Sequence, residues 1–459
     1  MKVAVLDVGK TNVKAVVVDL EAGRELAART KPNKVLTDGP YPHFDVDGIF
    51  TFFIASLKDL HAEFGFEAVS ITAHGASGAL IADDGLALPV LDYEFRYSAD
   101  IDRAYDAIRP PFRETFSPRL PGGLNLGAQL HFQKATFPDE FRNVRAIVTY
   151  PQYWGWRLTG ASAMDVTSLG CHTDLWLPRT GTFSSLVERL DIAGKLAPVR
   201  KPADMLGHVA GDVAARIGLV EPVPVYCGIH DSNASLLPHL LQREAPFAVV
   251  STGTWIVLFA VGGDLDRLAP ERDTLANVDA LGRAVPSARF MGGREFELLT
   301  GGKGAATPQA VKRVLDEGVF LTPGVVPGCG PYPHAQHRVV NASHALDADE
   351  TYVAASLYAA SMTKTCLDLT GAAGPIVVEG PFARNRLYIE ALSNAVARPV
   401  TAAAGSTGTS MGAALLAAHL SVPTMSASEE AGSTLASSED YRRYCNGWEA
   451  LLRGESLHG

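Results

Sequence analysis

Apolar and polar positions fall in blocks at the start of the chain. Two short apolar runs, residues 3–6 (VAVL) and 16–18 (VVV), flank the polar turn of residues 9–12 (GKTN). Such a pair of β-branched runs around a Gly-containing turn is typical of a β-hairpin. The same layout returns at 247–261 (FAVVSTGTWIVLFAV), around the turn 251–254. Two such hairpins, each near the start of a half of the chain, indicate an internal duplication.

The first turn carries groups that suit a phosphate. Its backbone N–H groups, the Thr11 hydroxyl, the Asn12 amide and the Lys10 ammonium lie within a few residues. Together they form a candidate phosphate cradle. Asp7, at the end of the first strand, could hold a hydrated Mg²⁺. Most turns of this kind are only turns, so the pattern by itself leaves both interpretations open.

Helical and strand patterns alternate after the hairpin. Residues 41–66 carry apolar positions at spacings of three and four, which predict a helix. A strand over 68–72 then leads to His74, and the turn signal at 83–85 predicts a second hairpin. His74 therefore lies where a strand gives way to a loop, the position at which open α/β sheets place ligand groups. A buried or capping histidine is the alternative.

A later strand leads into an aromatic-rich helix. Residues 144–160 read VRAIVTYPQYWGWRLTG, and Gly160 is expected to end the helix. Trp154 and Trp156 could face a sugar ring, because aromatic faces pack on sugar C–H surfaces. Core packing is the alternative for at least one of them.

The stretch 223–235 (VPVYCGIHDSNAS) places a carboxylate at a strand-to-helix junction. An apolar strand ends near Gly228, His230 and Asp231 follow, and a helix is expected over 234–243. An Asp there can cap the helix and meet its dipole. It can also accept a proton from a substrate hydroxyl. Both interpretations fit this stretch.

The second half alternates strands, glycine loops and helices, an order that suits a nucleotide lying against helix N-termini. The predicted elements are a helix over 349–369, a strand over 375–378, a loop over 379–385, a helix over 387–397, a strand over 400–403, a loop over 405–409, a helix over 410–419 and a tail helix over 441–452.

Composition narrows the function classes. The chain has 459 residues, too many for one ordinary core, so we expect about two domains. A formal net charge of −10 argues against a nucleic-acid partner. We find no uninterrupted apolar run of membrane-spanning length and no signal-peptide pattern, so we expect a cytoplasmic protein without a membrane partner. The five cysteines are scattered and odd in number, which predicts neither a disulfide framework nor a metal-ligand spacing.

Seven motifs taken in order are specific together. They read DVGKTNVK, AHG, WGWRLTG, GIHDSNAS, STGTW, EGPFARN and GSTGTSMGAALLA. The chain resembles the FGGY carbohydrate kinases of the sugar kinase/Hsp70/actin superfamily over nearly its whole length. This resemblance implies an α/β fold of two ribonuclease-H-like domains, each a mixed central sheet flanked by helices, with an interdomain cleft. The expected limits are 1–243 for the N-terminal domain, 244–434 for the C-terminal domain and 435–459 for a helical tail.

The resemblance also assigns roles residue by residue. Asp231 matches the catalytic base, and Asp7 matches the carboxylate that positions Mg²⁺. The positions that match the ATP-binding segments are Thr11, Asn12, Lys14, Thr252, Gly253, Thr254, Gly380 and Asn385. The positions that match the sugar side are His74, Gly75 and His230, together with Asp231.

Two segments depart from the family pattern. Many relatives begin the adenosine loop with three glycines, whereas this chain has Gly380-Pro381-Phe382. The segment 92–96 (DYEFR) stands where many relatives carry a Trp, an Asp and an Arg near the sugar. Glu94 and Arg96 could serve there, but we carry over no role for them.

The implied activity is transfer of the γ-phosphoryl group of ATP, with Mg²⁺, to a sugar hydroxyl. The wording of the motifs is closest to rhamnulokinase-like and fuculokinase-like members, so the expected acceptor is L-rhamnulose or L-fuculose and the product a 1-phosphate. The alternatives are a kinase for a pentulose or polyol such as xylulose, ribulose or glycerol, a non-catalytic sugar sensor, and an actin-like or Hsp70-like ATPase with protein partners. A small-molecule sugar and ATP are thus the expected partners, and dimers are common in the family.

Overall fold

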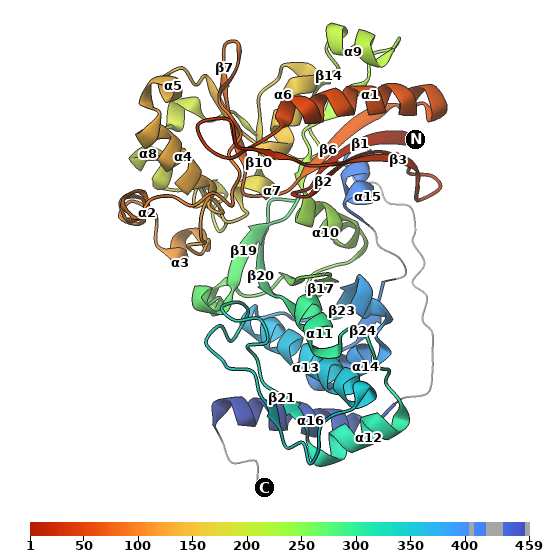
Figure 1. Cartoon of the computed structure of the whole chain (residues 1–459). Coiled ribbons are helices and arrows are strands. Elements are labelled where there is room, and N and C mark those ends of the chain that lie inside the picture. Colours follow the sequence, from red (N-terminus) through yellow and green to blue (C-terminus); the bar gives the residue numbers. More distant parts are fainter. Residues whose placement is uncertain (404–407, 419–434, 455–459) are drawn as a thin grey trace. The chain divides into compact units, whose positions relative to one another are not determined.

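The computed structural model describes residues 1–403, 408–418 and 435–454, and the chain divides into two compact units (Figure 1). The first unit contains Met1–Arg243, Ala276–Ala284 and the described part of Thr407–Thr424. The second contains Glu244–Leu275 and Val285–Ser406, with the described part of Met425–Gly459. Two segments that we expected in the domain 244–434 therefore belong to the first unit. The part of the predicted loop 405–409 before residue 408, and the end of the predicted helix 410–419, lie outside the described residues.

The central sheet of the first unit is built on the predicted hairpin. Strand β1 (Lys2–Val8) pairs antiparallel with β2 (Asn12–Asp19), and Val8 lies opposite Val13 across the turn. The strand order is β14-β15-β6-β1-β2-β3, and β16 also pairs with β6. Strands β1, β6 and β16 run parallel, so their carboxyl ends meet at one edge. The bounds of the other strands are Arg24–Pro32 for β3, Ala68–Ala73 for β6, Met205–His208 for β14, Pro224–Tyr226 for β15 and Ile229–His230 for β16.

Helices cover both faces of this sheet because successive residues of each strand point to opposite sides. On one face, α1 (Val46–Phe64) contacts β2, and α6 (Tyr150–Thr159) contacts β6. On the other face lie α10 (Asp231–Gln242) and α15 (Gly408–Leu415), which contact each other and β6. The core on this second face contains Val3, Val5, Val16 and Val18. The Ser70 hydroxyl also points to this face, since it donates to the Ala413 carbonyl of α15 at 2.6 Å. Smaller elements of this unit include β5 (His43–Phe44), β7 (Gly78–Ala82), β8 (Gly85–Leu88), α2 (Ala99–Asp106), α4 (Leu126–Thr136), β9 (Ala146–Thr149) and α9 (Gly211–Ile217).

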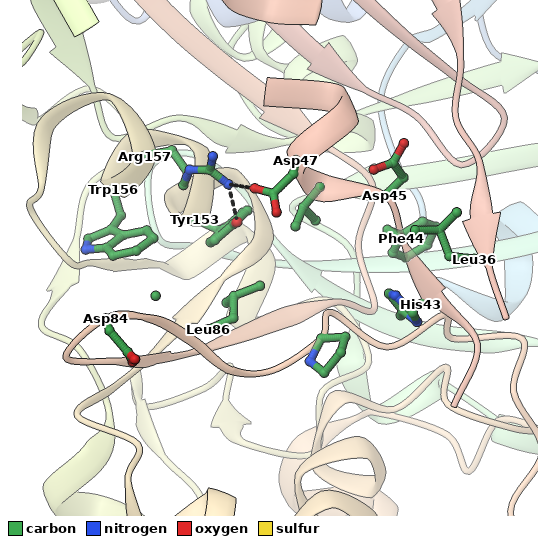
Figure 2. Close-up of a pocket in the computed structure, with 13 residues that line it drawn as sticks. Leu36, His43, Phe44, Asp45, Asp47, Asp84, Leu86, Tyr153, Trp156 and Arg157 are labelled. Carbon is green, nitrogen blue, oxygen red and sulfur yellow. Dashed lines mark hydrogen bonds and ion pairs between the residues drawn. The ribbon is translucent and has the colours of Figure 1, made fainter. Parts of the chain in front are cut away.

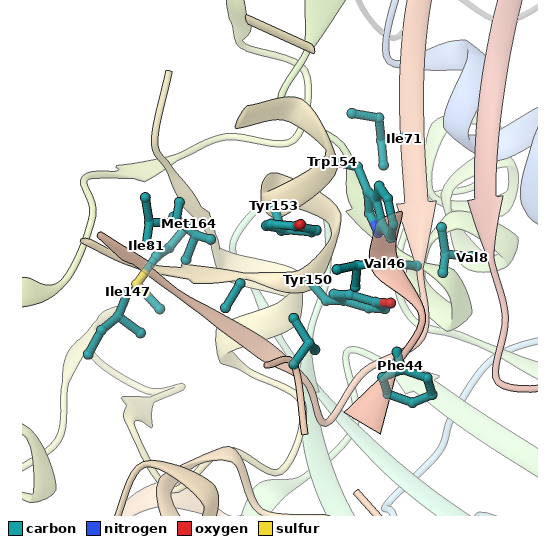
Figure 3. Close-up of a cluster of buried hydrophobic side chains, with 14 of the residues drawn as sticks. Val8, Phe44, Val46, Ile71, Ile81, Ile147, Tyr150, Tyr153, Trp154 and Met164 are labelled. Atoms are coloured by element: carbon teal, nitrogen blue, oxygen red, sulfur yellow. The ribbon is translucent and has the colours of Figure 1, made fainter. Parts of the chain in front are cut away.

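The two tryptophans of α6 differ in burial. Trp154 is fully buried in the apolar cluster of this unit (Figure 3). Its ring lies edge-on to Phe53 at 5.5 Å between centroids. Trp156 is only half-buried and stacks on Tyr153 at 5.9 Å. The helix ends at Gly160 in the left-handed region, as predicted. Trp154 is therefore a core residue, whereas Trp156 keeps an accessible face.

The second unit repeats the layout of the first. Strand β17 (Phe247–Thr252) pairs antiparallel with β18 (Ile256–Val261), which confirms the second hairpin. The strand order β20-β18-β17-β23-β24 matches β3-β2-β1-β6-β15, with the first three strands antiparallel and the last three parallel. The predicted duplication is thus confirmed at the level of topology. The other main elements are β20 (Ala284–Phe290), α11 (Gly292–Thr300), α12 (Pro308–Glu317), α13 (Ala348–Leu369), β23 (Ile376–Glu379), α14 (Arg386–Val396), β24 (Val400–Ala402) and α16 (Ser438–Arg453).

Both units bury substantial cores. Tyr358 and Trp448 are among the largest fully buried side chains of the second unit. The predicted helices 349–369 and 387–397 correspond to α13 and α14, and the tail helix begins three residues earlier than predicted, at Ser438. Among the helices of the described ranges, none is long and apolar enough to cross a membrane.

Candidate active site

Three parallel strand ends bring the predicted residues of the first unit together. Asp7 lies opposite Thr72 in the β1–β6 register, and His230 lies opposite Ala73 in the β6–β16 register. His74 and Asp231 each follow their strand directly. Carboxyl ends of parallel strands share one edge of a sheet. The residues predicted from separate motifs therefore meet at that edge.

Asp231 is the first residue of α10, and its carboxylate is not the cap. The N-cap is His230, and Asp231 accepts hydrogen bonds from the adjacent Ser232, at 2.6 Å from N and 3.2 Å from Oγ. His230 Nε2 lies 3.2 Å from the same oxygen, Oδ1. Among the described residues, these bonds all fall on Oδ1 and leave Oδ2 for a ligand. The side chain of Asp231 is 30% exposed. The protein around the carboxyl shields it from water, and this desolvation raises its pKa.

The tautomer of His230 follows from its neighbours. The Asn233 side-chain amide lies 3.3 Å from Nδ1, and an amide N–H can only donate. Nδ1 is then the acceptor, so Nε2 carries the hydrogen and donates to Asp231. Burial lowers the pKa of His230 to about 4, so the ring is neutral near pH 7. His230 thus orients the carboxylate without placing a positive charge beside it.

Gly75 makes this arrangement possible by its lack of a side chain. A Cβ on Gly75 would lie 2.8 Å from His230 Nε2 and 3.3 Å from Cys171 Sγ. Any larger residue would displace the imidazole. The loop after β6 can therefore pass directly against the ring that orients Asp231.

His74 is buried among three aromatic rings. Its ring centroid lies 5.2 Å from Phe44, 5.3 Å from Tyr93 and 4.9 Å from Tyr150. Nδ1 donates to the Gly75 carbonyl at 2.8 Å, and burial lowers the pKa of His74 to about 4. The neutral ring therefore presents a bare acceptor at Nε2, which is buried and has no partner among the described residues. A hydrogen-bond donor, such as a ligand hydroxyl, would satisfy this atom.

Asp7 occupies a position that fits a divalent cation. Its Oδ2 accepts from Thr409 Oγ at 2.7 Å. Burial raises the pKa of Asp7 to about 6, and the charge of Asp231 adds to the effect. The hydroxyl of Thr72, beside Asp7 in the register, is buried without a partner in the described part of the chain. A hydrated Mg²⁺ would relieve the repulsion between the two carboxylates, and it prefers oxygen ligands of this kind.

The first turn is held by its backbone. Gly9 N donates to Asn12 O at 2.9 Å, and Asn33 N donates to Thr11 O at 2.8 Å. Thr11 and Asn12 are exposed. Lys14 lies opposite Asp7 on the neighbouring strand, and its ammonium pairs with Glu25 at 2.7 Å. These residues are accessible to a ligand at the strand edge.

Lys10 differs from our expectation for that turn. Its ammonium does not stand free in the turn; it pairs with Asp92, and it lies 3.3 Å from Glu94. It also lies over the rings of Tyr93, at 4.6 Å, and Phe44, at 5.1 Å. These are two of the rings that enclose His74. No periodicity or motif links residue 10 to residue 92, so sequence reasoning had no signal for this pair.

In the second unit, the predicted ATP-binding residues surround the turn after β17. Gly253 and Thr254 are exposed, whereas the buried Thr252 hydroxyl donates to the Glu379 carbonyl and accepts from Phe382 N at 3.1 Å. A Cβ on Gly380, whose φ is +79°, would lie 1.9 Å from Thr252 O. The Thr252 hydroxyl therefore fixes the Gly380 loop rather than pointing freely to a ligand.

Two further contacts shape this part of the second unit. Asn385 caps α14, since its Oδ1 accepts from Tyr388 N at 3.1 Å and its amide donates to Ser356 at 2.9 Å. At the second turn, a Cβ on Gly293 would lie 1.8 Å from Gly253 O. The start of α11 thus packs directly on the turn, a contact that the sequence did not reveal. Glu295, in the same helix, is buried and bonded to Tyr358 at 3.0 Å.

Comparison with known proteins assigns the family. Residues 124–238 match the N-terminal domain of the FGGY family of carbohydrate kinases, and residues 244–425 match the carbohydrate kinase FGGY C-terminal domain. The chain belongs to the FGGY family of carbohydrate kinases. This result confirms the family, the fold class and the phosphotransferase class that the motifs implied.

Relatives of this FGGY chain differ in sequence identity and in the share of the chain that they cover. A carbohydrate kinase from Novosphingobium aromaticivorans is 35% identical, with 98% of this chain and 100% of that chain covered and a TM-score of 0.90. A xylulose kinase from Rhodospirillum rubrum shares the fold, with a TM-score of 0.78 at 18% identity and 99% of each chain covered. L-fuculokinase of Salmonella typhi is 26% identical over 273 residues, which span 58% of this chain and 57% of that enzyme.

A separate cavity is lined in part by both residues of β5, His43 and Phe44. It has a volume of about 570 Å³, and Trp156, Tyr153 and Arg157 form one wall (Figure 2). Arg157 bonds to Asp47 at 2.9 Å and to the Tyr153 hydroxyl at 2.8 Å. None of the residues predicted for the FGGY site lines this cavity. The accessible face of Trp156 therefore belongs to this cavity and not to the cluster around His74 and Asp231.

Proposed function

We propose that the chain transfers the γ-phosphoryl group of ATP to a hydroxyl of a ketose, with L-rhamnulose or L-fuculose as the first choice of acceptor and a 1-phosphate as product. The observation that carries the proposal is the geometry of Asp231, whose Oδ1 is fixed by Ser232 and His230 while Oδ2 has no partner among the described residues. The match to an L-fuculokinase supports the choice of acceptor.

Asp231 would act as the general base. Oδ2 accepts a hydrogen bond from the acceptor hydroxyl. It takes the proton as the new bond from the sugar oxygen to Pγ forms and the bond between Pγ and the leaving ADP breaks. The raised pKa of Asp231 makes it a better proton acceptor than an exposed carboxylate. Phosphoryl transfer depends mostly on positioning and charge stabilisation, so such a base contributes about 10²- to 10⁴-fold.

His74 and His230 would position the acceptor and the base, respectively. The bare Nε2 of His74 accepts a hydrogen bond from a second sugar hydroxyl, which satisfies its only open polar atom. A site built around such an atom discriminates strongly against analogues that lack the hydroxyl. The Nε2–H of His230 keeps Asp231 in one orientation.

For the nucleotide, we propose the residues of the two turns. Asp7 would hold Mg²⁺ through water or directly, with Thr409 fixing its carboxylate at 2.7 Å. When bound, Mg²⁺ offsets the charge of the β- and γ-phosphates. Lys14 and the backbone of the first turn would contact phosphate oxygens. The positions proposed for the second unit are Thr252, Gly253, Thr254, Gly380 and Asn385.

The test is acceptor-dependent formation of ADP. We expect ADP release with Mg²⁺-ATP and at least one of L-rhamnulose, L-fuculose, L- or D-xylulose, L- or D-ribulose or glycerol, and mass spectrometry of the product should show one added phosphoryl group. Sugar binding without ADP release would indicate a sensor instead. ADP release that does not depend on any acceptor would indicate an ATPase. Both results would contradict the proposal.

A further inference from the structure

Lys10 lies in the first turn, but its ammonium belongs to the acceptor side of the site. It pairs with Asp92, whose side chain is 8% exposed, and with Glu94 at 3.3 Å. It also lies over Tyr93 at 4.6 Å and Phe44 at 5.1 Å. An ammonium with two carboxylate partners and two aromatic faces is fixed in place.

We propose that Lys10, held by Asp92, is a specificity-determining residue that binds the acceptor at the end remote from the reacting hydroxyl, and that its carboxylate neighbours restrict the acceptor to neutral sugars and polyols. This inference rests on the proposed function and deepens it by naming the chemical class of the acceptor.

The position of Lys10 follows from shared contacts. The rings of Tyr93 and Phe44 each touch both Lys10 and His74, with ring separations of 5.3 Å and 5.2 Å from His74. His74 is followed by Gly75, which packs on His230. His230 in turn contacts Asp231 at 3.2 Å. A series of contacts thus links Lys10 to the proposed base through His74, whose Nε2 is buried without a partner among the described residues. We call this series of residues the wall.

Lys10 also has bonding capacity left for a ligand. An ammonium carries three N–H donors, and one of them donates to Asp92, while Glu94 lies in ion-pair distance at 3.3 Å. The side chain of Lys10 is 22% exposed, so a remaining donor is accessible. Asp92 already holds the Lys10 side chain in one conformation. Binding of a sugar oxygen to this ammonium therefore costs little additional side-chain entropy.

The charges along this wall exclude an acid. In the described contacts of the cluster, the ammonium of Lys10 stands beside the carboxylates of Asp92 and Glu94, and Asp231 adds a third at the far end. His74 and His230 are neutral near pH 7, since burial lowers the pKa of each to about 4. The wall therefore carries excess negative charge, which repels the carboxylate of a sugar acid.

Steady-state kinetics of Lys10→Met test whether Lys10 binds the acceptor. We expect the KM for the best neutral acceptor to rise at least tenfold, with the KM for ATP within twofold of wild type and Lys10→Arg restoring part of the loss. Lys31→Met is the matched control, because Lys31 is another partly buried lysine of this unit, bonded to Gly48 O at 3.0 Å. A rise in the KM for ATP, or no change in either constant, would overturn the assignment.

Glu94→Gln tests whether the carboxylates restrict the acceptor to neutral sugars. The side chain of Glu94 is 68% exposed, so its replacement does not threaten folding. We expect wild type to prefer the neutral acceptor over D-gluconate by at least a hundredfold in kcat/KM, and the variant to narrow that ratio at least threefold. An unchanged ratio, or wild-type turnover of gluconate near that of the ketose, would overturn the inference while leaving the kinase activity established. Failure of wild type to phosphorylate any acceptor would instead refute the proposed function.

Discussion

His230 and Asp231 are adjacent in sequence and bonded in space, with Nε2 of the imidazole 3.2 Å from Oδ1 of the carboxylate. The pair spans a strand-to-helix junction, since His230 ends β16 and Asp231 begins α10. The bond therefore fixes a carboxylate at the point where the backbone turns. Oδ1 is oriented by the protein, and Oδ2 has no partner among the described residues.

Asp231→Asn should reduce turnover at least a hundredfold and leave ATP affinity within about twofold, because the amide keeps the size of the side chain but cannot accept the proton. Single-turnover phosphoryl transfer and nucleotide titration measure the two quantities. Asp212→Asn serves as the matched control, because Asp212 also lies in the first turn of a helix, α9, and is exposed. Turnover of Asp231→Asn near the wild-type rate would remove Asp231 from its role.

Gly75→Ala should lower kcat/KM for the acceptor at least tenfold. The added Cβ would lie 2.8 Å from His230 Nε2, so the imidazole must move away from Asp231. Overpacking of this kind also costs about 1–3 kcal/mol of stability. Gly211→Ala is the matched control, because nothing lies within 4 Å of a Cβ there. Equal kinetics for the two variants would show that His230 does not need its present position.

Asp7→Asn should stabilise the metal-free protein at pH 8 and not at pH 4. Burial raises the folded-state pKa of Asp7 to about 6, above its ordinary value of 3.8. The folded state therefore holds the proton more tightly, and wild-type stability falls as pH rises from about 4 to about 6 and stays lower above that. The variant lacks this loss, which is about 3 kcal/mol for a pKa that rises from 3.8 to about 6. Thermal unfolding in EDTA at both pH values measures it, and equal Tm values at pH 8 would contradict the expectation.

Trp156→Ala should leave the KM for the acceptor within twofold, whereas His74→Gln should raise it at least tenfold. Trp156 lines the cavity of about 570 Å³, which His74 does not line, while His74 presents a bare acceptor atom at Nε2. Initial-rate kinetics with saturating Mg²⁺-ATP compare the two directly. A large KM effect of Trp156→Ala alone would move the sugar site to the cavity.

Local patterns predicted most of the fold. Both hairpins, the strand before His74 and the helix ending at Gly160 follow from the spacing of apolar residues and from turn residues, which act over short range. Asp231 was found at a junction that sequence alone could assign to capping or chemistry. His230 is the N-cap residue, but Asp231 lies in the first turn and its carboxylate accepts from Ser232 N, so it still meets the helix dipole.

Long-range pairings could not be predicted in the same way. Lys10 and Asp92 are 82 residues apart, and nothing in either local pattern indicates the other. The Thr252 hydroxyl donates to the carbonyl of Glu379, 127 residues later, next to Gly380. A threonine in that turn could equally bind a ligand or make a structural hydrogen bond, so the sequence did not distinguish the two roles. Likewise α15 was expected in the second domain by chain order, whereas its contacts with α10 and β1 place it in the first unit.

The placement of α15 affects how the first unit folds during synthesis. Gly412 packs so closely on α10 that a Cβ there would lie 1.8 Å from Ala234 O, and α15 covers a sheet face made of Val3, Val5, Val16 and Val18. At about 5–20 residues per second, a ribosome that has passed residue 243 needs roughly ten to thirty seconds to reach residue 418. During that interval the nascent first unit exposes a valine surface, so its solubility depends on chaperones or on rapid completion of synthesis. A chain that stops at residue 243 keeps that surface permanently.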